Sequence, residues 1–161
     1  MAYADYSFYT TTYYGDVLTA TNAAKWLDRA SDELDTLTFG RLTFAFPTVE
    51  AHVIRVKKAA CALAEALCCI DEQRKAASLQ LGGDGNYHGA VASISSGRES
   101  ISFASAASAA AASVYAAAAA SKDAETNLLK DLAARYLANV PDANGINLLF
   151  AGVPWRIPRE E

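Results

Sequence analysis

The sequence predicts a mainly α-helical protein: a bundle of three to four helices with a small β-hairpin or extended loop and an extended C-terminal tail. Long stretches repeat apolar residues at the spacing of a helix face. Alanine, the strongest helix former, is abundant in the second half. Glycine clusters and prolines separate these stretches. The chain of 161 residues has the usual length of one domain, and we expect residues 1–161 to form one.

Residues 1–18 are an aromatic N-terminal segment, rich in tyrosine and threonine and ending near Gly15 and Asp16. Aromatic and β-branched residues favour extended backbone, and the Gly-Asp pair favours a turn. We therefore expect extended or irregular structure here rather than a helix. Aromatic side chains at this density are expected to pack against the rest of the protein.

Residues 20–78 hold the first two helices. The first runs from about Ala20 to Leu37, with Thr19 or Thr21 as its cap and Gly40 at its close. Its apolar face consists of Ala23, Trp26, Leu27, Ala30, Leu34 and Leu37.

The second helix is predicted to start near Pro47 and Thr48 and to end near Ser78, which makes it the longest element. Its apolar residues alternate steps of three and four, the pattern of a helix packed lengthwise against others. These residues are Val49, Val53, Val56, Ala60, Leu63, Leu67 and Ile70. The three cysteines, Cys61, Cys68 and Cys69, lie on this helix and are expected to be reduced and packed as small apolar residues.

Residues 79–103 are predicted to form a loop and a hairpin. Several glycines around Asp84 end the preceding helix, and alternating residues from Val91 to Phe103 indicate a small hairpin or an extended loop. Its serines suit the polar face of a hairpin better than a ligand-binding surface. A two-stranded ribbon alone is marginally stable in water, so it needs support from helices or from a neighbouring subunit.

Residues 104–140 combine an alanine-rich stretch with the final helix. Over residues 104–120 the high helix propensity favours a helix or partial helix over low-complexity disorder. The final helix ends at Val140, with Lys122, Asp123, Lys130, Asp131 and Arg135 on its solvent side.

Residues 141–161 are predicted to be an extended tail, because Pro154 and Pro158 interrupt an otherwise apolar sequence. Apolar side chains in an irregular terminal segment must be covered by something. The tail is therefore expected either to cross the core of its own subunit or to dock on another one.

Composition and motifs argue against several functions. Fourteen basic and 18 acidic residues give a formal charge of -4, which argues against a dense basic face wrapping nucleic acid. No stretch is apolar over enough residues for a membrane span, and the cysteine pattern suggests a reducing compartment. No nucleophile, phosphate-binding or metal-binding motif occurs, and neither His52 nor His88 has catalytic neighbours in the sequence. We expect a protein that is not an enzyme and that has no metal and no cofactor.

Several stretches are similar to one known family. They are YADYSFYTTTYYG at the N-terminus, WLDRASDELDTLTFGRL in the first helix, ASISSGRESISFASAA in the middle, and LAARYLANVPDANGINLLFAGVP near the C-terminus. In this order and spacing the chain resembles the head-tail connector proteins of tailed bacteriophages, also described as head-completion or DNA-packaging adaptor proteins. The alanine-rich stretch is longer than usual for that family, and Pro141 to Asn144 has the character of an insertion.

The resemblance implies a non-enzymatic subunit of a homo-oligomeric ring, typically twelve-fold, that docks beneath the portal and extends the DNA channel. Its partners would be copies of itself, the portal protein, a tail-completion or stopper protein, and DNA that passes without sequence readout. It would be found in the virion neck of a phage or prophage, and in the host bacterial cytoplasm during assembly, without contact to a membrane.

Two groups of residues become candidates for contacts through this resemblance. Ring or channel contacts are assigned to Ser93, Ser95, Gly97, Arg98, Ser100 and Ser102. Docking of the tail is assigned to Phe150, Gly152, Val153, Pro154, Trp155 and Ile157.

An alternative is a soluble helical regulator or DNA-binding module. Its contact surface would hold Arg55, Lys57 and Lys58, a short basic patch with acidic neighbours. Steep salt dependence of duplex DNA binding would favour the regulator, and ring-sized particles would favour the connector.

Overall fold

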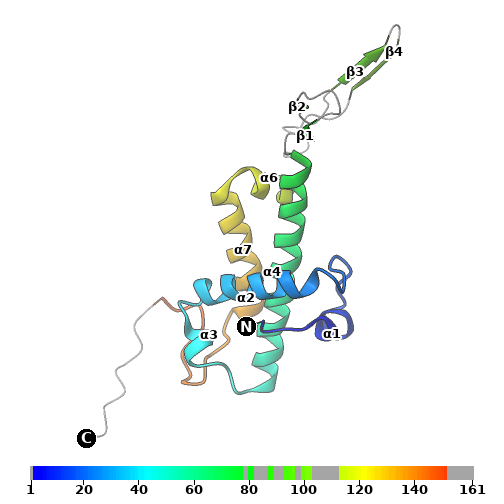
Figure 1. Cartoon of the computed structure of the whole chain (residues 1–161). Coiled ribbons are helices and arrows are strands. Elements are labelled where there is room, and N and C mark those ends of the chain that lie inside the picture. Colours follow the sequence, from blue (N-terminus) through cyan, green and yellow to red (C-terminus); the bar gives the residue numbers. More distant parts are fainter. Residues whose placement is uncertain are drawn as a thin grey trace, which may run out of the picture. The chain divides into compact units, whose positions relative to one another are not determined.

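The protein is mainly helical, as the sequence predicts (Figure 1). A computed structural model describes residues 2–77, 80–81, 87–88, 93–96, 99–102 and 113–151. Contacts divide the chain into two compact units, one made of Met1–Glu65 with Lys130–Glu161 and the other of Ala66–Leu129. Each unit is described below by itself.

The N-terminal segment of the first unit is helical, so the expectation of extended structure is wrong there. One turn, α1 (Tyr6–Phe8), continues into the π-helix η1 (Tyr9–Tyr13). The Asp5 side chain caps α1 by accepting a hydrogen bond from the amide of Phe8 at 2.7 Å. The helical turn also stacks the rings of Tyr9 and Tyr13, with centroids 5.8 Å apart. Capping and ring packing therefore outweigh the strand preference of these residues.

Helix α2 (Ala23–Leu37) confirms the first predicted helix. Of its predicted apolar face, five side chains are buried and Leu37 is half-buried. The N-cap position belongs to Asn22 rather than to Thr19 or Thr21. The Asn22 side chain accepts a hydrogen bond from the Thr19 amide at 2.9 Å and thus closes the turn that precedes the helix.

Helix α4 (Glu50–Ala77) confirms the long second helix and is the longest element in Figure 1. Its predicted seam is buried at Val56, Ala60, Leu63 and Ile70, whereas Val49 lies before the helix and is exposed. Burial extends beyond the seam, because all of residues 59–64 are buried. Six successive residues cover every side of a helix. In the first unit α4 is therefore a central helix, and its alanines allow neighbouring segments to approach closely.

The chain leaves the last helix of the first unit through a folded turn, whereas an extended tail was expected from residue 141. Pro141 and Asn147 form an antiparallel bridge, and the Leu148 amide donates to the Val140 carbonyl at 2.9 Å. Leu148 is fully buried. The predicted tail thus contributes to the core of its own subunit up to this point, and residues 152–161 lie outside the described residues.

The second unit contains the C-terminal part of α4 and four short strands. They are β1 (Gln80–Leu81), β2 (Tyr87–His88), β3 (Ser93–Ser96) and β4 (Glu99–Ser102). Strand β1 pairs with β2 and β3 pairs with β4, both antiparallel.

Two helices follow, α6 (Val114–Ala120) and α7 (Lys122–Leu137). The predicted alanine-rich helix is thus present over residues 114–120, and residues 104–112 lie outside the described part. In the second unit Arg74 of α4 forms an ion pair with Glu125 of α7 at 2.7 Å and donates to the Ala119 carbonyl at 3.3 Å. The five charged residues predicted on the solvent side of α7 are all exposed. No helix within the described residues is long and apolar enough to cross a membrane.

Candidate functional site

The loop after α2 presents two phenylalanines to solvent. Helix α2 ends in a hydrogen-bonded turn in which the Gly40 amide donates to the Asp35 carbonyl at 2.7 Å and the Phe39 amide to the Thr36 carbonyl at 3.2 Å. This turn requires left-handed backbone at its end, and Phe39 adopts it with φ of 55°, followed by Gly40 at 73°. Phe39 is therefore fixed in an exposed position by the backbone itself.

A short helix, α3 (Arg41–Phe44), begins directly after this turn. Its last residue, Phe44, is 90% exposed, and Phe39 is 61% exposed. The Phe44 ring lies over Gly40, since a Cβ atom at Gly40 would be only 3.4 Å from the ring. We call these two neighbouring residues the Phe39–Phe44 surface.

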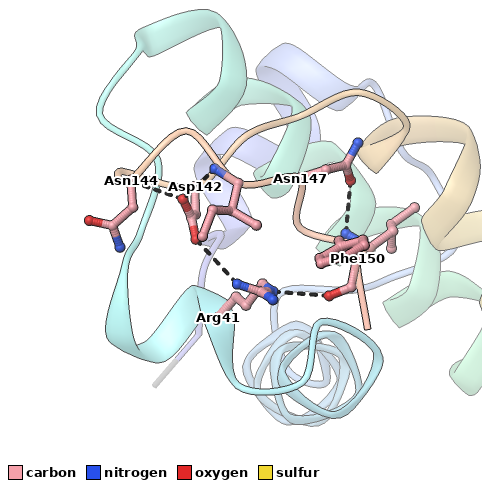
Figure 2. A network of polar contacts seen from close by, with 7 residues as sticks. Arg41, Asp142, Asn144, Asn147 and Phe150 are labelled. Carbon is pink, nitrogen blue, oxygen red and sulfur yellow. Dashed lines mark hydrogen bonds and ion pairs between the residues drawn. The ribbon is translucent and has the colours of Figure 1, made fainter. Parts of the chain in front are cut away.

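A buried ion pair connects α3 to the turn that follows the last helix (Figure 2). The Arg41 guanidinium lies 3.7 Å from the Asp142 carboxylate, and the two side chains are only 9% and 2% exposed. The other oxygen of Asp142 accepts hydrogen bonds from the amides of Asn144 at 2.8 Å and Ile146 at 2.9 Å. A carboxylate shared between a guanidinium and two amides holds the C-terminal turn in one conformation.

Arg41 also contacts the last described part of the chain. Its Nε donates to the Phe150 carbonyl at 3.1 Å, and its guanidinium carbon lies 6.0 Å from the centre of the Phe150 ring (Figure 2). The Phe150 ring is 54% exposed. The chain therefore reaches residue 151 beside α3, whose last residue, Phe44, belongs to the Phe39–Phe44 surface.

The predicted contact residues fall in different parts of the chain. Phe150 is the described member of the predicted tail-docking group, and Gly152, Val153, Pro154, Trp155 and Ile157 lie outside the described residues. In the predicted ring-contact group, the register pairs Ser93 with Ser102 and Ser95 with Ser100. Gly97 and Arg98 also lie outside the described residues.

Sequence reasoning missed Phe39, Phe44, Arg41 and Asp142 as a group. A local signal existed for Asp142, because an Asp shortly before an Asn-Gly pair, here Asn144-Gly145, is typical of a turn closed by a side-chain oxygen. No local signal connects it with Arg41, since the two residues are far apart in the sequence. The exposure of Phe39 and Phe44 was not predicted, because phenylalanine is usually buried in the core.

A second polar cluster fixes the N-terminal segment to α4. The Tyr9 hydroxyl donates to Glu65 at 2.7 Å and accepts from the amides of Val17 at 2.9 Å and Leu18 at 3.0 Å. Tyr13 donates to the other oxygen of Glu65 at 3.2 Å. Burial raises the pKa of Tyr9 to about 12, and the hydrogen bond to Glu65 adds to this.

The pKa values of two further tyrosines and one cysteine of the first unit are also raised. Burial and the nearby Glu65 carboxylate raise the pKa of Tyr13, and burial with the Asp35 hydrogen bond raises that of Tyr3. Burial, followed by the charge of Glu65, raises the pKa of the Cys61 thiol to about 12. A thiol with this pKa is protonated at neutral pH and is a poor nucleophile. The arrangement suits a structural anchor rather than catalysis.

Side chains of metal-ligating types and a cavity occur in the described part of the chain. Within it no group of three or more His, Cys, Asp and Glu side chains is placed to hold a metal ion. A cavity of about 490 Å³ opens beside the N-terminal segment, lined by four alanines, Tyr6, Leu27, Asp5, Lys25 and Asp28. Its lining contains no histidine, cysteine or serine.

Two residues of the basic patch Arg55, Lys57 and Lys58, which the regulator alternative assigns to DNA binding, contact other parts of the protein. Arg55 donates to the Ala138 carbonyl at 3.1 Å, at the C-terminal end of α7, and the Lys57 ammonium lies 5.3 Å from the centre of the Phe8 ring. The first contact provides a donor for a backbone carbonyl at the end of a helix, and the second places a cation over an aromatic ring. Two of the three cations therefore have a role in the fold.

Comparisons of the chain with protein families, with curated proteins and with solved structures found no match.

Proposed function

We propose that this chain is a structural subunit of a phage or prophage head-tail connector ring, docking beneath the portal and extending the DNA channel. The observation that carries the proposal is the Phe39–Phe44 surface. Two phenylalanines are exposed here, Phe39 in the turn before α3 and Phe44 at the end of α3, and the buried Arg41 fixes this short helix to the core. Clustered apolar side chains on a rigid surface are typical of contacts between proteins.

In this proposal the contacts come from three elements around a bundle of three to four helices. The β3–β4 ribbon supplies ring or channel contacts through the serines assigned above together with Gly97 and Arg98. The Phe39–Phe44 surface and the tail from Phe150 onward supply contacts between neighbouring subunits or with the portal. A ring needs two different surfaces on each subunit that meet by rotation, and a tail with a separate aromatic surface meets that need.

The net charge supports a channel that DNA passes through. Each phosphate neutralised by Lys or Arg adds affinity, so a basic wall would retain DNA. A chain with a formal charge of -4 presents no such excess. The proposed partners are copies of the same chain, the portal protein, a tail-completion or stopper protein, and DNA bound without sequence readout. The proposed location is the virion neck, after assembly in the host cytoplasm.

The regulator alternative has less support, because Arg55 and Lys57 already contact the protein itself. A DNA-contact surface would require these side chains to turn outward. Lys58 alone would add little affinity, since nonspecific DNA binding depends on several phosphate contacts.

The test is assembly with and without the portal. Purified chain, alone and mixed with portal rings, is measured by mass photometry and negative-stain microscopy, and we expect rings that form on the portal. Phe44→Ser should weaken or abolish ring formation, because it removes an exposed apolar contact without altering the core. Val114→Ser is the matched control, since Val114 is 65% exposed in the other unit.

Two outcomes would contradict the proposal. One is a chain that stays monomeric at all concentrations and does not bind the portal. The other is tight binding to duplex DNA that falls steeply with salt, which would favour the regulator.

A further inference from the structure

The first unit holds a cavity as well as the Phe39–Phe44 surface, and the two lie at opposite ends of α2. Ala24 and Leu27, in the first turns of this helix, line the cavity, whereas α3 follows its other end (Figure 1). A helix rises about 1.5 Å per residue, so Ala24 and Leu37 are about 20 Å apart. We propose that Phe44 of one chain inserts into the cavity of a second copy, so that copies join head to tail.

The cavity has room for the ring of a phenylalanine. Its volume is about 490 Å³. An apolar cavity of about 150 Å³ is enough to bind benzene, which has the size of the Phe44 ring. The cavity can therefore accept Phe44 without an enlargement of the fold.

The lining of the cavity suits an aromatic guest. Ala4 and Leu27 are the buried part of the lining and offer an apolar contact. Tyr6 also lines the cavity and is 37% exposed, so its ring is accessible. Aromatic rings in contact stabilise each other beyond the area that they bury. Phe44, which is 90% exposed in its own chain, would gain these contacts on insertion.

The charges on the two surfaces are compatible with this contact. The charged residues of the cavity lining are all exposed, so they can stay in contact with water. They are Asp5, Lys25 and Asp28. The incoming surface brings no charge against them, because Arg41 is the only charged residue among residues 36–49 and is paired with Asp142. An apolar centre with a polar rim is the usual arrangement of a protein interface.

The occupant is assigned to a second copy because both halves of the contact lie on this chain and are separated by the length of α2. A contact between two different surfaces leaves one of each surface free, so it repeats from copy to copy. Where the rotation between copies closes, the product is a ring. The step from a pair to a ring rests on the proposed function, whereas the insertion of Phe44 does not.

The area of the contact predicts that it is weak in solution. A phenylalanine side chain has about 200 Å² of surface, so exposed fractions of 90% and 61% leave about 300 Å² of Phe44 and Phe39 for contact. Stable pairs of proteins bury about 800 Å² on each partner. Dilute chains are therefore expected to stay monomeric, and copies held side by side on a portal would join through this contact.

The experiment captures the weak contact covalently. A chain with Phe44→p-benzoylphenylalanine, a photo-crosslinking residue, is mixed at sub-millimolar concentration with the isotope-labelled parent chain and irradiated. Mass spectrometry of the digested dimer locates the crosslink, and the isotope label shows that it joins two molecules. Position 44 is exposed, so the larger side chain leaves the core unchanged.

We expect dimers whose crosslinks fall on the cavity lining of the labelled chain, within residues 2–28. Ala24→Trp in the labelled chain fills the cavity and should lower the yield of dimer by about tenfold, because burial of one aromatic side chain contributes at least that factor to association. The matched control is Ala134→Trp, which places the same side chain at an exposed alanine of α7.

Three results would overturn the inference: no dimer, crosslinks that fall outside the cavity lining, or equal yields from Ala24→Trp and Ala134→Trp. Any of these together with ring formation on the portal would leave the connector function intact. Crosslinks in the cavity of a chain that does not bind the portal would contradict the connector function and support this inference.

Discussion

The two ends of the first unit are fixed by different chemistry. Near the N-terminus, the neutral hydroxyls of Tyr9 and Tyr13 share the carboxylate of Glu65. Near the C-terminus, two opposite charges, Arg41 and Asp142, meet in a site that is almost closed to water. We call the first the tyrosine anchor and the second the ionic anchor.

The difference decides what each anchor tolerates. A neutral hydroxyl costs little to bury when its hydrogen bonds are made, and the tyrosine anchor loses stability only if the phenol is deleted or ionised. A buried ion pair depends on both partners, because removing one leaves the other charge in a poorly solvated site. The ionic anchor should therefore respond more to mutation and the tyrosine anchor more to pH.

The largest expected effect comes from Asp142→Ala. Arg41 loses its carboxylate, and the amides of Asn144 and Ile146 lose their acceptor, so the free energy of unfolding should fall by about 3–5 kcal/mol. Chemical denaturation measures it, with Asp131→Ala on the exposed side of α7 as control. Equal stability of the two variants would show that the ion pair does not hold the C-terminal turn.

A smaller loss is expected from Tyr9→Phe. The variant removes a hydroxyl that donates to Glu65 and accepts from two amides, at a cost of about 1–3 kcal/mol for buried groups left unsatisfied. The matched control is Tyr14→Phe, because Tyr14 is exposed. If both variants unfold at the same denaturant concentration, the tyrosine anchor contributes only its ring.

High pH should separate the two anchors. The pKa of Tyr9 is about 12 in the folded protein against 10.0 for the ordinary side chain, so its stabilising effect is complete below pH 10 and disappears as pH rises toward 12. At about pH 11 this contribution is reduced by about 1.4 kcal/mol. Between about pH 8 and 11, Tyr9→Phe should therefore lose less stability than the parent.

The same titration with Asp142→Ala provides the comparison. This variant keeps Tyr9 and its hydrogen bonds, so Asp142→Ala should lose as much stability with pH as the parent chain. Cys61, whose pKa is also raised to about 12, is present in all these proteins and adds the same slope to each. If the unfolding free energy of Tyr9→Phe fell with pH as steeply as that of the parent chain, Tyr9 would not be a source of the pH dependence.

The helices could be predicted because they depend on local pattern. The spacing of Trp26, Leu27 and Leu34 gives the buried face of α2, and the run from Val56 to Ile70 gives α4. The π-helix at Tyr9 could not be predicted, because it depends on contacts with Glu65 and on Gly15, where any side chain would collide with the Tyr9 ring.

The candidate site could be predicted from the sequence less well than the fold. Arg41 and Asp142 meet only after the chain has closed, and no periodic pattern marks such a pair. Phe39 and Phe44 look like core residues in the sequence, and only their position in a tight turn and a four-residue helix leaves them outside. Phe150 was assigned to docking, yet its carbonyl and the neighbouring Leu148 belong to the fold of their own subunit.

The backbone conformation at Phe39 affects the stability of the fold. A residue with a side chain in left-handed backbone is less stable by roughly 1 kcal/mol than glycine would be. The exposed ring gains no burial in return within the described residues. Selection for folding alone would favour glycine or asparagine at this position. A phenylalanine in left-handed backbone and exposed to solvent therefore lowers the stability of the fold, and the contact proposed for the Phe39–Phe44 surface would offset that loss only in an assembly.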